Sequence, residues 1–307
     1  MTPEPKPGGA RLDEAYAACR AIARHKAKNF YYAFVALPAP RRNAICATYA
    51  FMRQADDFAD DESLPREERS RRLDEWLAAW RDACRGAGTT DPVFLALLDA
   101  TRRFAIPLSL LDELAAGMTM DLRPAGDAPD TYATFADLYA YCYRVASVVG
   151  LVCIRIFGYQ DSAAEKLAEE TGIAFQLTNI LRDVAEDARH NRVYLPLEDL
   201  RSHGVSPDSL IHRAPGSPPT ASERALLAEL ALRAEAYYMS ARRLLPLIDP
   251  ESRPALWVLV SIYHRLLRRI VGADYDVFSR RVSVPPAQKL GILAVGQARM
   301  VLARLSA

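Results

Sequence analysis

Apolar residues recur at three- and four-residue spacing from about Arg11 onward in this chain of 307 residues. Ala, Leu, Arg and Glu dominate, and alternating β-branched runs are few, which is the pattern of amphipathic helices. Half of the residues are hydrophobic and only 14 are glycine, so the chain can bury a large core. We therefore expect an all-α, single-domain helical bundle over residues 11–307, preceded by a flexible leader over residues 1–10.

Composition argues against several classes of protein. Lys plus Arg total 39 against 38 for Asp plus Glu, so no overall charge indicates a nucleic acid as partner. The five cysteines are scattered and never spaced as C-x-x-C, which argues against a disulfide framework and a zinc site. The N-terminal segment lacks the apolar stretch of a signal peptide, and the apolar run 146–154 is too short to span a bilayer. We expect a cytoplasmic protein, at most peripheral to a membrane.

A first acidic motif lies in residues 49–62, where Asp56 and Asp60 stand four residues apart. On a helix such residues share one face, with Cβ atoms roughly 5–6 Å apart, so that their carboxylates can bind one ion. Arg53 falls on the same stripe, one turn earlier. A solvated acidic helix end is the alternative, but the apolar aromatic run 45–52 directly before the motif favours a functional site.

A second polar stripe lies in residues 172–187. At about 100° per residue, Gln176, Asn179, Asp183 and Asp187 fall within a narrow arc of a helix whose other residues are mostly apolar. Buried carboxylates are unfavourable unless they are paired or bind metal. The stripe therefore predicts a set of metal ligands.

Carboxylate clusters without His or Cys suit a hard cation, and Mg²⁺ is usually held by one or two carboxylates together with substrate phosphates. Arg53, Arg182 and Arg192 lie close to the acids in sequence and can complete a phosphate site, although each alone is as well explained as a surface ion pair. Residues 139–153 mix aromatic and small side chains on one helix. That helix is either a plain core helix or the wall of an apolar cavity in which an aromatic face stabilises a carbocation.

Three segments carry a resemblance to a known family: YAFMRQADDFADD at 49–61, YCYRVASVVG at 141–150 and FQLTNILRDVAEDARHNRVYLP at 175–196. Over residues 22–290 the chain resembles the squalene/phytoene synthase family, which joins prenyl diphosphates head to head and has the class I terpenoid synthase fold. The resemblance implies a central cavity in the helical bundle and a magnesium-dependent prenyltransferase of isoprenoid biosynthesis, on a route to squalene, carotenoids or hopanoids.

The resemblance also implies roles for individual residues. The first magnesium clamp is Asp56 and Asp60, and the second is Asn179, Asp183 and Asp187. Phosphate or metal-shell roles fall to Arg53, Gln176, Arg182 and Arg192, and site-lining roles to Tyr141, Tyr194 and Tyr275. Lys28 and Phe30 match a flap that often reads Ser-x-Ser-Phe, but residues 27–30 read Ala-Lys-Asn-Phe here and lack its hydroxyl groups. The family's Ala-Gly-x-Val-Gly is Ala-Ser-Val-Val-Gly at 146–150, which narrows the expected cavity.

The implied reaction ionises one prenyl diphosphate, and the double bond of a second attacks the allylic cation. Proton loss, steered by Tyr141 or by the released diphosphate, then closes a cyclopropane ring. Farnesyl diphosphate, giving presqualene diphosphate or a squalene-type product, is the favoured substrate, and geranylgeranyl diphosphate giving phytoene is the alternative. NADPH is needed only if squalene is the final product.

Two other classes of protein stay open. A head-to-tail prenyltransferase or terpene cyclase should lack the N-I-L-R-D-x-x-E-D run followed by R-x-Y-L-P, and a noncatalytic assembly subunit should have lost clamp aspartates. Expected partners are prenyl diphosphates, a membrane surface contacted transiently during product release, and other isoprenoid-pathway enzymes. The amphipathic C-terminal segment 289–307 is expected to pack on the core and not to anchor the protein.

Overall fold

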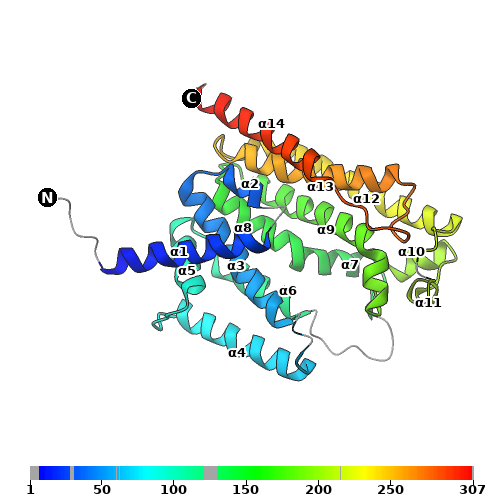
Figure 1. Ribbon diagram of the computed structural model, residues 1–307, viewed down its shortest axis with the longest axis horizontal. Helices are drawn as coiled ribbons and strands as arrows, with labels where there is room; N and C mark the ends of the chain where they lie inside the picture. Colours follow the sequence, from blue (N-terminus) through cyan, green and yellow to red (C-terminus); the bar gives the residue numbers. More distant parts are fainter. Residues whose placement is uncertain are drawn as a thin grey trace.

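The computed structural model describes residues 7–27, 31–59, 61, 63–120, 130–214 and 216–305. Helices form most of the described chain, and they pack around α9, which runs through the middle of the molecule (Figure 1). The elements in chain order are α1 (Pro7–Lys26), α2 (Tyr31–Val35), α3 (Ala39–Ala59), α4 (Arg66–Cys84), α5 (Pro92–Arg103), α6 (Leu108–Met120), β1 (Asp130–Thr131), α7 (Phe135–Cys142), the π-helix η1 (Tyr143–Ser147), α8 (Val148–Phe157), α9 (Ala163–Arg189), β2 (Arg192–Val193), α10 (Leu197–Ser202), α11 (Pro207–Ile211), α12 (Ala221–Leu244), the 3₁₀-helix η2 (Leu245–Leu247), α13 (Arg253–Gly272) and α14 (Pro286–Leu305).

The all-α prediction is confirmed. Within the described ranges the strands are β1 and β2, two residues each, which pair in parallel with Asp130 opposite Arg192. All five cysteines are free. Helix α1 begins at Pro7, inside the range expected to be a leader, while residues 1–6 lie outside the described residues. The division into a leader and one domain over 11–307 stays a prediction.

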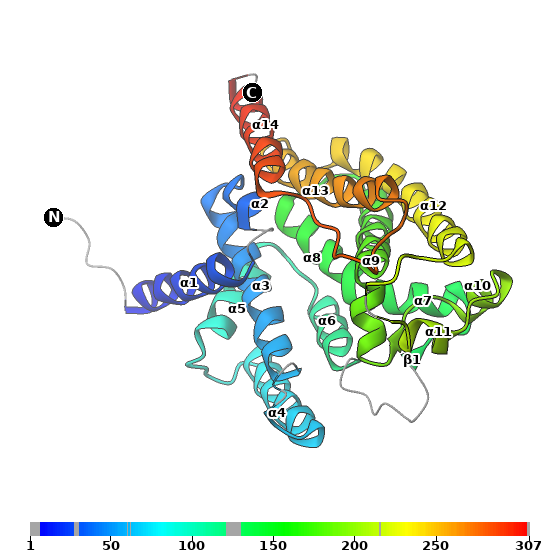
Figure 2. The ribbon, with the colours of Figure 1, turned by 45° about the vertical axis from the view of Figure 1, so that its right-hand side comes forward.

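The long helix α9 organises the bundle because it is apolar on most of its circumference. It contacts α12, α8, α13 and η1, and Figures 1 and 2 both place it between these elements. Its buried apolar residues around the predicted stripe are Ile173, Ala174, Leu177, Ile180, Leu181 and Val184. The stripe itself, Gln176, Asn179, Asp183 and Asp187, is half-buried. The polar side chains of this stripe therefore face a partly enclosed space and not bulk water.

The segment α7–η1–α8 packs its backbone directly against α9. A capping box between Thr134 and Asp137 starts α7, and a π-helical turn then interrupts the regular helix, a feature often found at functional sites. A Cβ atom on Gly172 of α9 would lie 2.5 Å from the Cα atom of Ser147. One on Gly150 of α8 would lie 3.1 Å from the carbonyl oxygen of Ala168. Glycine at these positions lets the helices approach to backbone contact.

The same segment, Phe135–Phe157, has the length and apolar composition of a membrane-spanning helix, with a mean hydropathy of 1.6. It contacts α9 and α6 inside the bundle, and 44% of its most apolar window is buried. A core helix of a helical bundle has these same properties.

Candidate active site

A cavity of about 810 Å³ opens between α3, η1, α8, α9, α13 and the start of α14. Its polar end is lined by five basic side chains: Lys26, Arg53, Arg182, Arg281 and Lys289. No Asp or Glu is among the described residues that line it. Burial, and then the positive charge of Arg182, lower the pKa of Lys289. Crowded cations of this kind are stabilised by a bound anion, and phosphate groups are the anions that arginine and lysine recognise best.

A second cavity of about 190 Å³ continues from the first and shares five lining residues with it: Met52, Ala146, Val149, Phe175 and Leu259. Its remaining lining residues are largely apolar and include Phe34, Ile45, Cys153, Ile154, Phe157, Leu244 and Leu256. The hydroxyl groups of Thr48 and Thr171 donate to main-chain carbonyl oxygens four residues earlier. The site thus has a cationic mouth and an apolar interior.

Two stacked aromatic rings lie where the cavities meet. The rings of Phe175 and Tyr263 are 4.3 Å apart between centroids and inclined by 15°. Phe175 lines both cavities and Tyr263 lines the first. Burial raises the pKa of Tyr263 to about 12, and its hydroxyl group is hydrogen-bonded to Asn179. An aromatic face at this point can stabilise positive charge that develops between the mouth and the interior.

The first acidic motif forms the last turns of α3 at the cavity mouth. Asp57 accepts a hydrogen bond from Arg53 Nε at 2.8 Å, and Lys26 Nζ lies 3.9 Å from the same carboxylate oxygen. Both basic residues line the cavity. Asp56 is exposed beside them, and α3 ends at Ala59. Arg53 lies one turn before Asp57, which is its partner in an ion pair.

The second acidic motif borders the same mouth from α9. Asp183 accepts hydrogen bonds from Arg182 Nε at 2.8 Å and from Arg281 Nη2 at 3.0 Å, and Arg281 also pairs with Glu186 at 3.0 Å. Gln176 and Asn179 line the cavity directly. The two motifs therefore flank one cavity, since each is joined by ion pairs to cations that line it.

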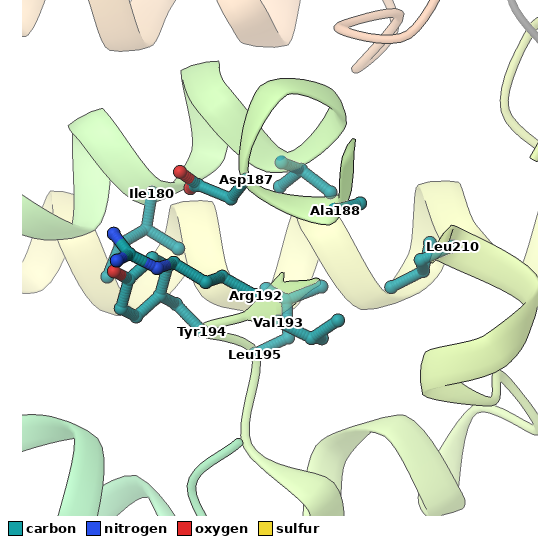
Figure 3. Close-up of a pocket in the computed structure, with 9 residues that line it drawn as sticks. Ile180, Asp187, Ala188, Arg192, Val193, Tyr194, Leu195 and Leu210 are labelled. Carbon is teal, nitrogen blue, oxygen red and sulfur yellow. The ribbon is translucent and has the colours of Figure 1, made fainter. Parts of the chain in front are cut away.

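Asp187 stands one turn further along α9, at a small pocket that it shares with Arg192 and Tyr194. Burial, and then the charge of Asp183, raise the pKa of Asp187 to about 7, although Arg192 acts in the opposite direction. Figure 3 shows Arg192 and Tyr194 reaching toward the same side as the carboxylate of Asp187. Arg192 belongs to β2 and Tyr194 follows it. The short turn after α9 therefore brings these two predicted residues back beside Asp187.

Tyr141 belongs to an aromatic cluster next to this pocket. Its side chain is 6% exposed, and its ring stacks on that of Tyr194 at 5.1 Å and 21°. Tyr132 completes the cluster, 5.4 Å from Tyr141 and 6.1 Å from Tyr194 between centroids. Tyr141 is not among the described residues that line the cavities of about 810 and 190 Å³.

Four predicted site residues are placed elsewhere or not described. Lys28, Phe30 and Asp60 lie outside the described residues. Tyr275 sits in the turn after α13 with φ of 58°, half-buried, and is not among the described residues that line any of these cavities. Its role in the site stays a prediction.

The residues at the cavity that sequence reasoning missed include four with ionisable side chains: Lys26, Tyr263, Arg281 and Lys289. Each comes from an element other than the two acidic helices, so no spacing within one helix links it to them. The doublet at residues 280–281 and Lys289 lie near Tyr275 in the sequence, and that local positive charge was the one available signal.

The residues present fit a magnesium ion. The Oδ1 atom of Asn179 is buried and accepts no hydrogen bond from the described residues, so it is an oxygen ligand without a partner. Burial and the nearby charge of Asp183 raise the pKa of Asp187, and a bound cation would offset both effects. No three His, Cys, Asp or Glu side chains gather into one cluster in the described ranges. Magnesium takes one or two carboxylates and completes its shell with phosphate oxygens and water.

The sequence matches a family of known proteins. The sequence profile of the squalene/phytoene synthase family matches residues 23–288. A phytoene synthase of Mycobacterium tuberculosis is 36% identical over 290 residues, which cover 94% of this chain and 93% of the relative. A 15-cis-phytoene synthase of Synechococcus elongatus is 34% identical over 304 residues, which cover 94% of each chain.

Solved structures agree on the fold. A crystal structure of a dehydrosqualene synthase superposes with a TM-score of 0.80 at 29% identity and covers 96% of this chain and 99% of its own. The squalene synthase HpnC from Alicyclobacillus acidocaldarius superposes with a TM-score of 0.77 at 28% identity, over 87% of this chain and 97% of its own.

Fold and sequence together define a prenyltransferase with the all-α terpenoid synthase fold. More narrowly, the chain belongs to the squalene/phytoene synthase family, whose members condense prenyl diphosphates head to head.

Proposed function

We propose that this chain joins two identical allylic prenyl diphosphates head to head in a magnesium-dependent reaction. The observation that carries the proposal is the cavity: basic groups crowd its mouth, an aromatic stack borders its middle and an apolar pocket forms its inner end. A diphosphate fits the basic mouth, and a prenyl chain fits the apolar inner end.

Five residues would hold magnesium: Asp56, Asp60, Asn179, Asp183 and Asp187. When bound, the ion supplies charge neutralisation for a leaving diphosphate. The protein's own cations share that task, because Arg53, Arg182, Arg281, Lys26 and Lys289 are already gathered at the mouth. Gln176 lies beside Asn179, and its Oε1 atom accepts a hydrogen bond from Asn179 Nδ2 at 3.4 Å.

The reaction begins when the C1–O bond of the donor breaks and its electron pair leaves with the diphosphate, which the basic side chains retain. The double bond of the second substrate attacks the allylic cation beside the face of Phe175. A proton is lost to the released diphosphate, and its former C–H electron pair closes the cyclopropane ring. The apolar pocket keeps water away from the cation. Tyr141 stacks on Tyr194 and is therefore assigned to positioning that ring next to Arg192 and Asp187.

For the prenyl chain length we favour geranylgeranyl diphosphate. The cyclopropyl intermediate would then lose its remaining diphosphate, rearrange and lose a second proton to that diphosphate, giving a phytoene-type product. The support is that relatives 34–36% identical over almost their whole length are named phytoene synthases. Farnesyl diphosphate, the substrate favoured from the sequence, is the second candidate. It is supported by the solved structures at 28–29% identity, which are a dehydrosqualene and a squalene synthase. NADPH enters only if farnesyl diphosphate is carried on to squalene.

The proposal is tested by incubating the purified chain with Mg²⁺ and either geranylgeranyl or farnesyl diphosphate, with and without NADPH. The extracted lipid is identified by chromatography and mass spectrometry. We expect a head-to-head product from one substrate and none after treatment with EDTA. Asp183→Asn should abolish turnover, whereas the matched variant Asp74→Asn on the exposed side of α4 should retain it.

Two outcomes would overturn the proposal. Product formation by Asp183→Asn at the rate of the unmodified chain would refute the clamp assignment. No product from either substrate, combined with binding to another family member, would favour a noncatalytic assembly subunit.

The proposed setting is the cytoplasm. Because the product is an apolar lipid, transient contact with a membrane surface and transfer to later isoprenoid-pathway enzymes are part of the proposal.

A further inference from the structure

Helix α14 packs on the bundle through one side only. A Cβ atom on Gly296 would lie 2.4 Å from Val258 Cγ2, so α14 crosses α13 in close contact at this point. The guanidinium of Arg299 lies 4.2 Å from the centroid of the Trp257 ring, and Ile292 packs against the core. Lys289 turns toward the cavity mouth. These contacts fix the rotation of the helix, and residues 289–299 of this segment pack on the bundle as expected.

The opposite side of α14 is exposed and apolar. Its exposed residues are Ala287, Leu290, Gly291, Ala294, Val295, Ala298 and Val301, and the polar Gln288 and Arg299 are exposed at its edge. Leu290, Val295 and Val301 are 54%, 47% and 53% exposed. In both ribbon views α14 forms an outer edge of the described chain (Figures 1 and 2). A helix that faces water normally carries charged residues there, as α4 does with its ion-paired Arg and Glu residues.

The surroundings of this apolar face are basic. Helices α13 and α14 contain no Asp or Glu, and their basic residues are Arg253, Arg265, Arg268, Arg269, Lys289, Arg299 and Arg304. On α13, Arg265 and Arg268 are exposed. Their spacing from Pro254 and Val258, which contact α14, places them on the same side of the helix. On the other border a cavity of about 270 Å³ is lined by Arg253, Arg299 and Trp257.

We propose that α14 and the adjoining face of α13 bind an anionic phospholipid surface, with α14 lying in its plane. Apolar residues on one side of a helix, flanked by cations and a tryptophan, are the features that hold a helix at a lipid–water boundary. A second copy of this chain fits less well, because pairing two such faces would bring two sets of basic residues together. The chain as a whole has a net charge of only +1, so the attraction is local to this face.

The placement has a consequence that rests on the proposed function. Val284 and Lys289, at the start of α14, line the cavity mouth. A helix lying on the lipid surface therefore brings that mouth next to the bilayer, and an apolar product can leave into lipid without crossing water.

Flotation with lipid vesicles tests the inference without any substrate. Vesicles of phosphatidylcholine alone are compared with vesicles that also contain phosphatidylglycerol. We expect binding to the anionic vesicles, at least tenfold weaker binding to the neutral ones, and weakening by added salt. Val295→Glu should bind at least tenfold more weakly. Leu232→Glu is the matched control, since Leu232 is a 71% exposed apolar residue on α12, and it should bind like the unmodified chain.

The possible results are distinguishable. Circular dichroism and thermal unfolding of both variants check that each is folded. Equal binding by Val295→Glu and Leu232→Glu, or no binding by the unmodified chain, would overturn the inference. A dimer in analytical ultracentrifugation that Val295→Glu converts to a monomer would identify a second copy as the occupant instead. Loss of the proposed synthase activity has no bearing on this assay, because vesicle binding is measured without prenyl diphosphates.

Discussion

Replacement of Asp187 by Asn should make the metal-free protein more stable, and more so at alkaline pH. The ordinary carboxyl pKa of 3.8 rises to about 7 in the folded chain because of burial and the charge of Asp183. The folded chain therefore binds this proton more tightly than the unfolded chain does. The resulting destabilisation is absent below the unfolded pKa, grows as pH rises and is complete above about pH 7. Asparagine has the same shape but cannot ionise.

The expected size follows from the two pKa values. Their difference corresponds to roughly 4 kcal/mol in the free energy of unfolding if fully expressed. Because the side chain is only half-buried, we expect about 2 kcal/mol, of which about 1 kcal/mol should appear between about pH 5 and pH 8. The assay is urea unfolding of both proteins in EDTA at these two pH values, with Asp74→Asn as the exposed control.

Addition of Mg²⁺ and inorganic pyrophosphate should reverse the order of stability. The ligands bind the folded state of the unmodified protein and raise its free energy of unfolding, whereas Asp187→Asn should respond weakly. The reasoning is refuted if Asp187→Asn raises the free energy of unfolding by the same amount at both pH values. The carboxylate would then carry no burial penalty in the folded chain.

Three further substitutions have definite expected effects. Gly172→Ala should lower the free energy of unfolding by about 2 kcal/mol in urea titrations, because its Cβ atom meets the backbone of Ser147. Arg281→Ala should weaken binding of magnesium pyrophosphate about tenfold by calorimetry, as one charged hydrogen bond contributes about 1.5–3 kcal/mol. Phe175→Leu should lower kcat about tenfold with little change in KM, because a cation–π contact contributes about 1–2 kcal/mol and leucine keeps the apolar volume.

Each of these has its own control. Gly291→Ala, at an exposed position with nothing within 4 Å of the new Cβ atom, should be neutral or stabilising. Arg85 lies just after α4, and its side chain is 71% exposed, so Arg85→Ala should leave pyrophosphate binding unchanged. A rise in KM with unchanged kcat for Phe175→Leu would contradict a role beside the cation and indicate simple packing of the prenyl chain.

The sequence predicted the helical elements and the polar stripe of α9 well, because both depend on a regular spacing within one helix. Of that stripe, Gln176 and Asn179 line the cavity, whereas Asp183 and Asp187 do not, and Asp183 is joined to it through its ion pairs with Arg182 and Arg281. It could not predict Lys26, Tyr263, Arg281 or Lys289, which reach the cavity from α1, α13, the segment after it and α14. Their positions depend on how helices far apart in sequence pack together. Asp60, Lys28 and Phe30 are not described, so their roles stay predictions.

Tyr141 illustrates a different limit of sequence reasoning. Its motif predicts that it lines the reaction site, but a short parallel pairing of β1 with β2 brings Tyr132 and Tyr194 against it from two distant segments. No helical periodicity contains that information. The π-helical turn after α7 is equally invisible in the spacing of apolar residues.

The contacts of Gly150 and Gly172 also bear on how this enzyme can be re-engineered. Because main chain touches main chain along that wall of the cavity, its cross-section is a property of the scaffold and resists change by point substitution. The far end is bounded by the side chains of Phe34, Ile45 and Phe157. A laboratory selection for bulkier or longer lipids should therefore accumulate its successful changes at that end and leave the two glycines untouched.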